Sequence, residues 1–296
     1  IRLGVSQVFR ETSFFIVMRL YKISLLFILY FFFSTEINAQ KHKTYHKSHI
    51  FSTALNAERE VWIHLPEDND NTKKYPVLVV LDAEMYFDLT LDLIENREKY
   101  GKFLASIIVG IPNPTMQERS RNMTFSISKV DQKGEKTSRY SVENSGHAKE
   151  FFNFMNDELF QFLAKNYSVE KDNFSLLGHS FGGYFALMQS ADASTFNKII
   201  AIDPSLWYSD GEVARTLSNA ISAIKNRANL EYYIAFQNGA KHNAENARNL
   251  IQFLNKNEVK VYSAEFSNEN HGSVFLPALV AVLRELGKNV DRAPRQ

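Results

Sequence analysis

The segment GHSFGG (178–183) holds the residues whose types and spacing could do covalent chemistry. It follows the apolar run 173–177 and precedes YFALM (184–188), which can open a helix. In a sharp strand-to-helix turn a serine hydroxyl projects above the sheet, and flanking glycines avoid collisions with nearby backbone. The first N–H groups of the helix can stabilise a developing oxyanion. The motif predicts that Ser180 is a nucleophile, and a chance match in a glycine-containing turn is the alternative.

A serine hydroxyl needs a positioned base to take its proton. The strand–turn–helix motif resembles that of α/β-hydrolases, in which the chain order is serine, acid, histidine. The base should therefore follow Ser180 in a late loop, and we predict His271, which lies between the last expected strand and the last expected helix. His242 is the alternative. His179 adjoins the nucleophile in sequence, so its side chain should diverge from the hydroxyl, and we interpret it as pocket wall or scaffold.

Apolar runs separated by stretches of helical character are the elements that must position these residues. The runs are 49–55, 59–66, 77–81, 105–111, 173–177, 198–202, 231–236 and 259–266. The first two should form an antiparallel pair, and the alternation of later runs with helices predicts a mostly parallel sheet covered on both faces. Residues 113–145 are polar, and we expect a long irregular connection there.

Composition bounds the class of protein. The chain has 296 residues, 45% of them hydrophobic, and a formal net charge of +1. A charge so close to zero gives no electrostatic reason to expect nucleic acid or an anionic membrane as partner. The cysteine count is zero, which excludes disulfides, thiolate nucleophiles and cysteine metal sites. The chain also lacks the glycine-rich dinucleotide fingerprint, so we expect no cofactor and no metal.

The first residues resemble a targeting segment. Met18 opens a basic stretch that is followed by the apolar run 23–33 and by the small residue Ala39. This order is typical of a signal peptide, whereas a membrane span, the alternative, needs about 20 apolar residues. We expect residues 1–17 to come from an over-extended reading frame, cleavage after Ala39, and a single exported α/β-hydrolase domain over 40–296.

Further motifs resemble the Putative esterase (esterase D-like) family of α/β-hydrolases. They are 52–66, Tyr-Pro-Val-Leu (75–78), Leu-Asp (81–82), Gly-Ile-Pro-Asn (110–113), GHSFGG (178–183), Pro-Ser-Leu-Trp (204–207) and His-Gly-Ser-Val (271–274). The family includes enterochelin-type siderophore esterases, feruloyl and acetyl-xylan esterases, and S-formylglutathione hydrolase. The resemblance spans about residues 48–288 and implies a carboxylic ester hydrolase that acts on a small-molecule or oligosaccharide ester.

The resemblance also implies roles for individual residues. The oxyanion hole would use the backbone N–H of Phe181 and one from Ala83 or Glu84, and Trp207 would line the substrate pocket. We expect Glu84 and His179 to contact the substrate as well. Ala83 stands where relatives often have glycine, which is a departure from the family pattern.

The acid of a catalytic triad has more than one candidate. Relatives usually place a carboxylate soon after the strand that matches 231–236, but residues 237–242 contain none. Glu245 is the first acid afterwards, and we predict that it orients the base; a helix-dipole role at a helix start is its alternative. Asp203, at the end of the run 198–202, is a second candidate, and a Ser-His dyad is a third.

Together these features predict an exported serine esterase, in the periplasm or secreted. A ferric-siderophore esterase and a feruloyl or acetyl polysaccharide esterase are narrower alternatives. An exported location argues against S-formylglutathione hydrolase, whose substrate is cytosolic. A binding protein without catalytic activity on the same fold is the alternative from another class, because a fold alone does not establish chemistry.

Overall fold

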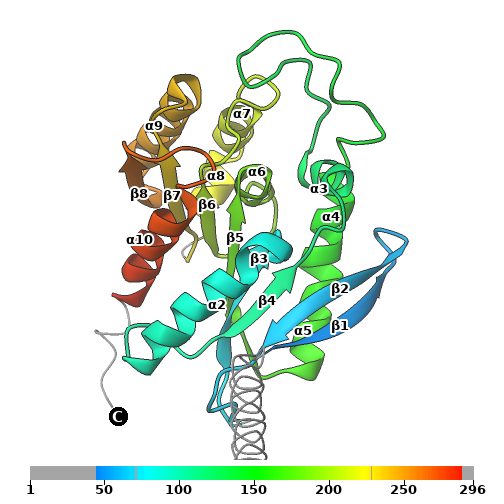
Figure 1. Cartoon of the computed structure of the whole chain (residues 1–296), viewed down its shortest axis with the longest axis vertical. Coiled ribbons are helices and arrows are strands. Elements are labelled where there is room, and N and C mark those ends of the chain that lie inside the picture. Colours follow the sequence, from blue (N-terminus) through cyan, green and yellow to red (C-terminus); the bar gives the residue numbers. More distant parts are fainter. Residues whose placement is uncertain (1–44, 71, 228, 289–296) are drawn as a thin grey trace, which may run out of the picture. The chain divides into compact units, whose positions relative to one another are not determined.

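An eight-stranded sheet forms the centre of the computed structural model, which describes residues 45–70, 72–227 and 229–288 (Figure 1). The strands are β1 (Tyr45–Ser52), β2 (Ala57–His64), β3 (Tyr75–Leu81), β4 (Ile107–Ile111), β5 (Val169–His179), β6 (Lys198–Ile202), β7 (Glu231–Gln237) and β8 (Lys260–Phe266). Their order is β1-β2-β4-β3-β5-β6-β7-β8. The pairs β1/β2 and β2/β4 are antiparallel and the others are parallel. The predicted α/β-hydrolase sheet, with antiparallel strands at its N-terminal edge, is confirmed.

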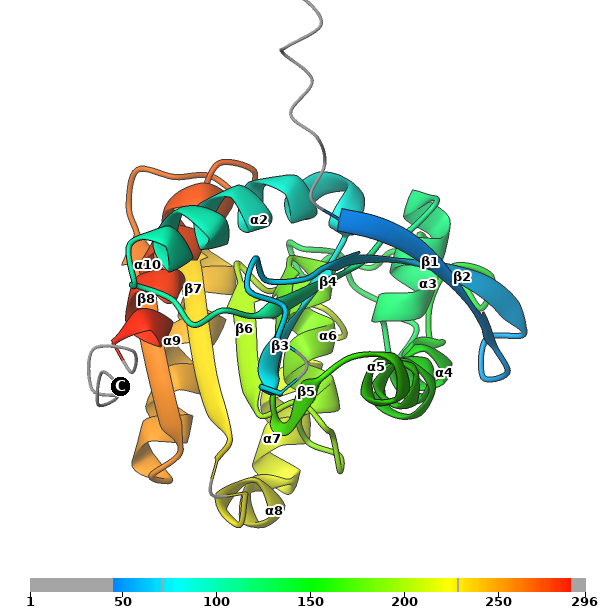
Figure 2. The same ribbon diagram turned by 90° about the horizontal axis from the view of Figure 1, so that it is seen from below.

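Helices cover both faces of the sheet (Figure 2). They are α2 (Ala83–Lys99), α3 (Met116–Met123), α4 (Ala148–Asn153), the π-helix η1 (Phe154–Leu159), α5 (Phe160–Asn166), α6 (Phe181–Gln189), α7 (Glu212–Asn219), α8 (Ile221–Lys225), α9 (Lys241–Lys256) and α10 (Phe275–Gly287). One hydrophobic core joins α2 and α10 to the sheet, and the other joins α4, η1, α6, α7 and α9 to its opposite face.

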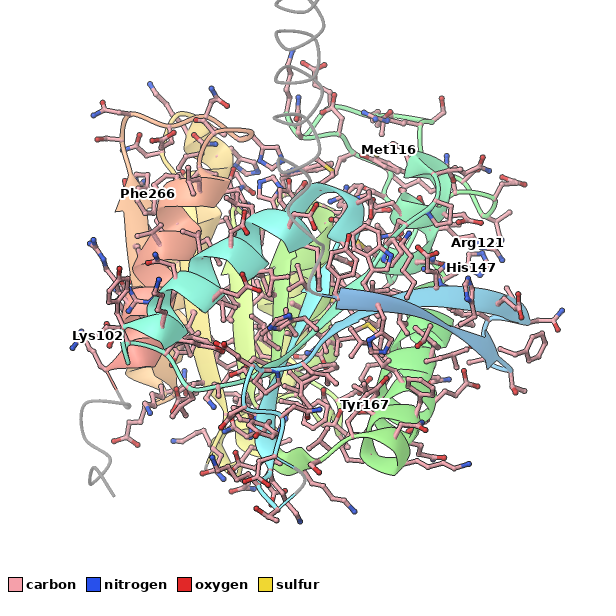
Figure 3. All side chains as sticks on the ribbon, turned by 60° about the horizontal axis from the view of Figure 1, so that its bottom comes forward. Lys102, Met116, Arg121, His147, Tyr167 and Phe266 are labelled. Carbon is pink, nitrogen blue, oxygen red and sulfur yellow. The ribbon has the colours of Figure 1, made fainter. Side chains whose placement is uncertain are left out.

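The central strands alternate between these two cores. In β3, Val77, Val79 and Leu81 pack into the core beneath α6, whereas Leu78 and Val80 pack against α2 and α10. This follows from the period of two in a strand, and it explains why a run buried on both faces is continuously apolar. Side chains fill the space between the sheet and the helices on both faces (Figure 3).

The polar segment 113–145 is only partly irregular, which corrects our expectation. It contains α3, whose first turn is capped by the side chain of Thr115, an acceptor for the N–H of Glu118. The chain then runs without regular helix or strand until α4, and returns to α3 where the N–H of His147 donates to the carbonyl of Arg121 at 3.1 Å (Figure 3).

The predicted signal peptide lies outside the described residues. Within the part of the chain that the structure describes, no helix is long and apolar enough to cross a membrane. Residues from Tyr45 onward belong to one compact unit.

Candidate active site

The nucleophile turn lies between β5 and α6. Ser180 has φ 59° and ψ −117°, a conformation rare for a residue with a side chain, and such strain typically costs about 1–3 kcal/mol. The turn is crowded: a Cβ on Gly178 would lie 2.2 Å from the backbone of Gly182, and one on Gly183 would lie 3.1 Å from Pro204. Gly178 is therefore required by the close approach of the backbone, and Gly183 leaves too little room for a side chain to fit without a shift of its neighbours.

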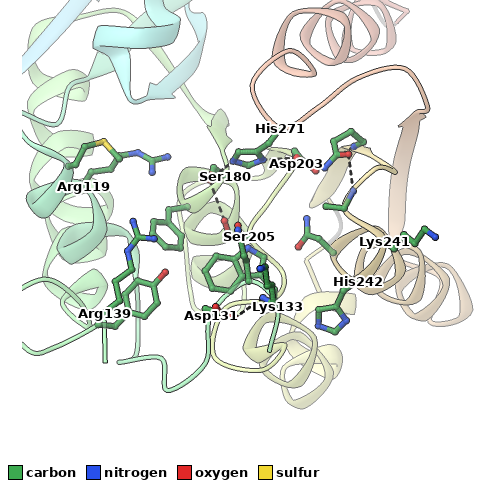
Figure 4. Close-up of a pocket in the computed structure, with 18 residues that line it drawn as sticks. Arg119, Asp131, Lys133, Arg139, Ser180, Asp203, Ser205, Lys241, His242 and His271 are labelled. Carbon is green, nitrogen blue, oxygen red and sulfur yellow. Dashed lines mark hydrogen bonds and ion pairs between the residues drawn. The ribbon is translucent and has the colours of Figure 1, made fainter. Parts of the chain in front are cut away.

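His271 faces this serine from the turn between β8 and α10. Its Nε2 lies 3.0 Å from the Oγ of Ser180, within hydrogen-bond distance (Figure 4). The side chain of His271 is 54% exposed, so this histidine stands at the open mouth of the site. The structure thus brings together the two residues that the sequence analysis paired. His242, the alternative base, is an exposed residue of α9 that lines the same pocket.

The carboxylate beside His271 belongs to Asp203, which corrects the assignment of Glu245. Asp203 directly follows β6, is fully buried, and places Oδ2 2.7 Å from Nδ1 of His271. Its oxygens also accept longer contacts of 3.4 Å from the backbone and side-chain N–H groups of Gln237. Glu245 is exposed on α9. The carboxylate in contact with His271 therefore lies at the end of β6, the strand next to β5, and not on α9.

Two helix N-termini converge beside Ser180. Phe181 is the first residue of α6, and Ala83 is the first residue of α2. A Cβ on Gly182 would lie 3.4 Å from the carboxylate of Asp82, so the end of β3 packs against the nucleophile turn. The first N–H groups of a helix have no acceptor within the helix. The N–H groups of Phe181 and Ala83 thus both stand at helix starts, and their role in an oxyanion hole stays a prediction.

A buried ion pair connects the end of β3 to the end of β5, next to Ser180. The guanidinium of Arg119, on α3, donates to both carboxylate oxygens of Asp82 at 2.8 Å and to the carbonyl of His179 at 3.2 Å. Asn113 donates to Asp82 at 3.0 Å. Burial disfavours a charged guanidinium, but the carboxylate of Asp82 outweighs burial and raises the pKa of Arg119 above its usual value. The sequence analysis missed Arg119, because nothing in its pattern separates it from the neighbouring Arg121.

Of the three residues expected to contact substrate, one lines the pocket and two do not. Trp207 lines the pocket next to Ser180 and Ser205, as expected for a substrate-contacting side chain. Glu84 does not line the pocket, and its carboxylate accepts the backbone N–H of Asn113 at 3.0 Å. Partial burial of this carboxylate raises its pKa. His179 is 4% exposed and does not line the pocket, which corrects its assignment.

The pocket above Ser180 has a volume of about 610 Å³. Ser205, which the sequence analysis did not single out, lies at its base with its Oγ 3.3 Å from that of Ser180. Lys133 and Arg139, from the loop before α4, and Lys241, from α9, line the pocket (Figure 4). None of these three cations makes an ion pair with another described residue. Nor does any group of three or more His, Cys, Asp or Glu among the described residues offer a metal site.

Known proteins similar to this chain are esterases. The model of the Putative esterase family matches residues 52–286. The chain is 27% identical over 245 residues to ferri-bacillibactin esterase BesA of Bacillus subtilis, with 76% of this chain and 83% of that protein covered. An apo-salmochelin esterase of Escherichia coli is 20% identical, covering 78% and 76%. The structure of an IroE-like serine hydrolase from Shewanella oneidensis superposes with a TM-score of 0.74 and 25% identity, covering 83% of this chain and 80% of that one. The chain therefore belongs to the Putative esterase family, and it is a carboxylic ester hydrolase with the α/β-hydrolase fold.

Proposed function

We propose that this esterase works through an acyl-enzyme on Ser180, with His271 as general base and Asp203 as the carboxylate that orients it. The observation that carries the proposal is the continuous chain of contacts from Ser180 Oγ to His271 Nε2, 3.0 Å, and from His271 Nδ1 to Asp203 Oδ2, 2.7 Å. A carboxylate at Nδ1 keeps the proton on that nitrogen and leaves Nε2 free to accept the proton of the serine.

The reaction then has two halves. Ser180 Oγ bonds to the ester carbonyl carbon while its proton passes to Nε2 of His271, and the oxyanion is held by the N–H groups of Phe181 and Ala83. Collapse of this intermediate breaks the carbon–oxygen bond to the leaving alcohol, which takes the proton from Nε2. Water loses a proton to the same nitrogen and attacks the acyl carbon. The bond from that carbon to Ser180 Oγ then breaks, Nε2 returns its proton to Oγ, and the acid is released.

The nucleophile is tested by Ser180→Ala together with a fluorophosphonate probe. The variant should lose all but a few per cent of ester hydrolysis, and mass spectrometry of the labelled wild-type protein should place the probe on Ser180. Ser205 is the internal comparison, because its hydroxyl lies 3.3 Å away but is not the one that faces Nε2 of His271. Labelling of Ser205, or substantial activity of Ser180→Ala, would refute the assignment.

We propose a siderophore ester as the substrate class. Two relatives, BesA and the salmochelin esterase, are named as esterases of siderophores, which supports this substrate class. The positive charge of the lysine and arginine side chains that line the pocket supports it as well. A siderophore that binds Fe³⁺ through several deprotonated oxygens is an anion, and cations at a pocket mouth attract anionic substrates. Hydrolysis of ferric enterobactin should exceed that of methyl ferulate in kcat/KM. Lys133→Glu and Arg139→Glu should raise KM for the ferric siderophore and leave KM for a neutral nitrophenyl ester unchanged.

We also propose export, on the pattern of residues 18–39. N-terminal sequencing of protein recovered from the expressing cells should begin near Gln40. An intact Met18 on protein from the cell envelope would favour an uncleaved anchor.

A further inference from the structure

His179 is a buried polar residue that the proposed mechanism does not use. It is the last residue of β5 and is 4% exposed. Its Nε2 lies 2.9 Å from the backbone carbonyl oxygen of His271, and its Nδ1 lies 2.8 Å from the hydroxyl of Tyr86, on α2. Both ring nitrogens therefore have a partner within hydrogen-bond distance, on two segments far apart in the sequence.

The partners dictate where the protons lie. A carbonyl oxygen can only accept, so Nε2 of His179 carries the hydrogen and donates to His271. In a neutral ring Nδ1 then accepts, and the hydroxyl of Tyr86 donates to it. Burial lowers the pKa of His179 to about 4, and burial raises the pKa of Tyr86 to about 12. Both groups thus keep these roles across the range in which an esterase with a histidine base operates.

Apolar packing fixes the same contacts. The ring of Phe275, at the start of α10, stacks on Tyr86 with centroids 3.9 Å apart and meets the ring of His179 edge-on at 5.9 Å. Phe275 is four residues after His271 in the turn that carries the base. The turn is thereby attached to α2 and β5 by a hydrogen bond and by an aromatic cluster.

His271 needs such an attachment because its side chain is exposed and its backbone lies in a loop. Asp203 holds Nδ1 of the ring, and the ring of His179 lies against that of His271 with centroids 4.6 Å apart. Neither contact acts on the carbonyl group of His271, which is held by the hydrogen bond from Nε2 of His179. A shift of about 1 Å in a reacting group can cost about 10²-fold in rate. His179 precedes Ser180 in the chain, so one residue links the turn of the nucleophile to the turn of the base.

We infer that His179 is a positioning residue for hydrolysis: its Nε2–H holds the carbonyl of His271 and keeps the His271 ring within reach of Ser180. The inference rests on the proposed function of this pair. It assigns to Tyr86 the supporting role of orienting the imidazole of His179.

Two substitutions at His179 separate positioning from mere packing. A glutamine can place its amide N–H near the position of Nε2, whereas a leucine fills similar space without a donor. His179→Leu should lower kcat on a nitrophenyl ester about 10- to 100-fold with KM within about twofold, and His179→Gln should recover kcat to within about threefold of wild type. Equal kcat values for the two variants, high or low, would overturn the inference.

Tyr86→Phe tests the same contact without changing the histidine. The ring of His179 loses its fixed orientation, so kcat should fall about 3- to 10-fold with KM unchanged. Tyr232→Phe is the matched control: its hydroxyl is buried and lies 2.8 Å from that of Ser190, near the amino end of β7 and away from the site. It should lower the free energy of unfolding comparably and leave kcat unchanged. An equal kcat for the two tyrosine variants would contradict the inference.

Ser180→Ala separates failure of the proposed function from failure of the positioning role of His179. If Ser180→Ala retains activity, the proposed function itself fails. If it is inactive while His179→Leu and Tyr86→Phe keep wild-type kcat, the proposed function stands and the positioning role fails.

Discussion

Replacing Asp203 with asparagine removes one charge from the proposed triad and keeps the size of the side chain. The carboxylate is fully buried and accepts a hydrogen bond from Nδ1–H of His271 at 2.7 Å. An asparagine that presents its NH₂ group to Nδ1 forces the imidazole proton onto Nε2. Nε2 of His271 then carries a hydrogen where it faces Ser180, so it cannot accept the proton of the serine hydroxyl.

The magnitude follows from what the amide can still do. In serine proteases the equivalent change lowers kcat about 10⁴-fold through the wrong tautomer. Here the amide can turn its oxygen toward His271, because the opposing contacts with Gln237 are long, 3.4 Å, and weak. The turned amide restores the tautomer but not the charge that stabilises the imidazolium. We therefore expect a loss of about 10³-fold in kcat/KM, about 4 kcal/mol in the activation free energy.

The assay is steady-state hydrolysis of one activated nitrophenyl ester, with the free energy of unfolding measured in parallel. Glu245→Gln is the matched control, since it removes one carboxylate charge from an exposed position on α9 and should stay within about twofold of wild type. A loss below tenfold for Asp203→Asn would refute the role of the carboxylate and favour a dyad. A larger loss for Glu245→Gln than for Asp203→Asn would restore the prediction made from the sequence.

Two further predictions concern stability. Gly178→Ala should lower the free energy of unfolding by more than about 3 kcal/mol, because its Cβ would lie 2.2 Å from the backbone of Gly182. Gly272→Ala is the control and should be nearly neutral, since its Cβ would have its nearest neighbour at 3.5 Å. Equal losses for the two variants in urea titrations would contradict this reasoning. Burial raises the pKa of Glu98 from 4.5 to about 7, so the folded state loses stability as pH rises from 4.5 to 7. Glu98→Gln, which can still accept the N–H of Ser106, should be more stable than wild type by about 1 kcal/mol at pH 8 and equal to it near pH 4.5; no pH dependence in that difference would contradict the reasoning.

Local patterns were sufficient for the existence of the strands and for the turn at Ser180, although β1 spans Tyr45–Ser52 rather than 49–55. Continuous apolar runs identify strands buried on both faces, because odd and even residues of such a strand each pack into one of the two hydrophobic cores. Gly178 is required by its contact with the backbone of Gly182, four residues later, so a short motif records it. His271 could also be placed from the sequence, since the chain order of the fold leaves the last loop for the base.

The carboxylate that meets His271 and the partners of His179 were decided by tertiary structure. Asp203 and Glu245 both lie between Ser180 and His271 in the chain, so sequence order cannot separate them. The difference is spatial: Asp203 ends β6, the neighbour of β5, whereas Glu245 lies on the exposed side of α9. His179 adjoins Ser180, but its side chain enters the core under α2 and α10, where Tyr86 and Phe275 meet it. Such contacts join residues far apart in the chain, and the folded sheet, rather than any local spacing, sets which of them meet.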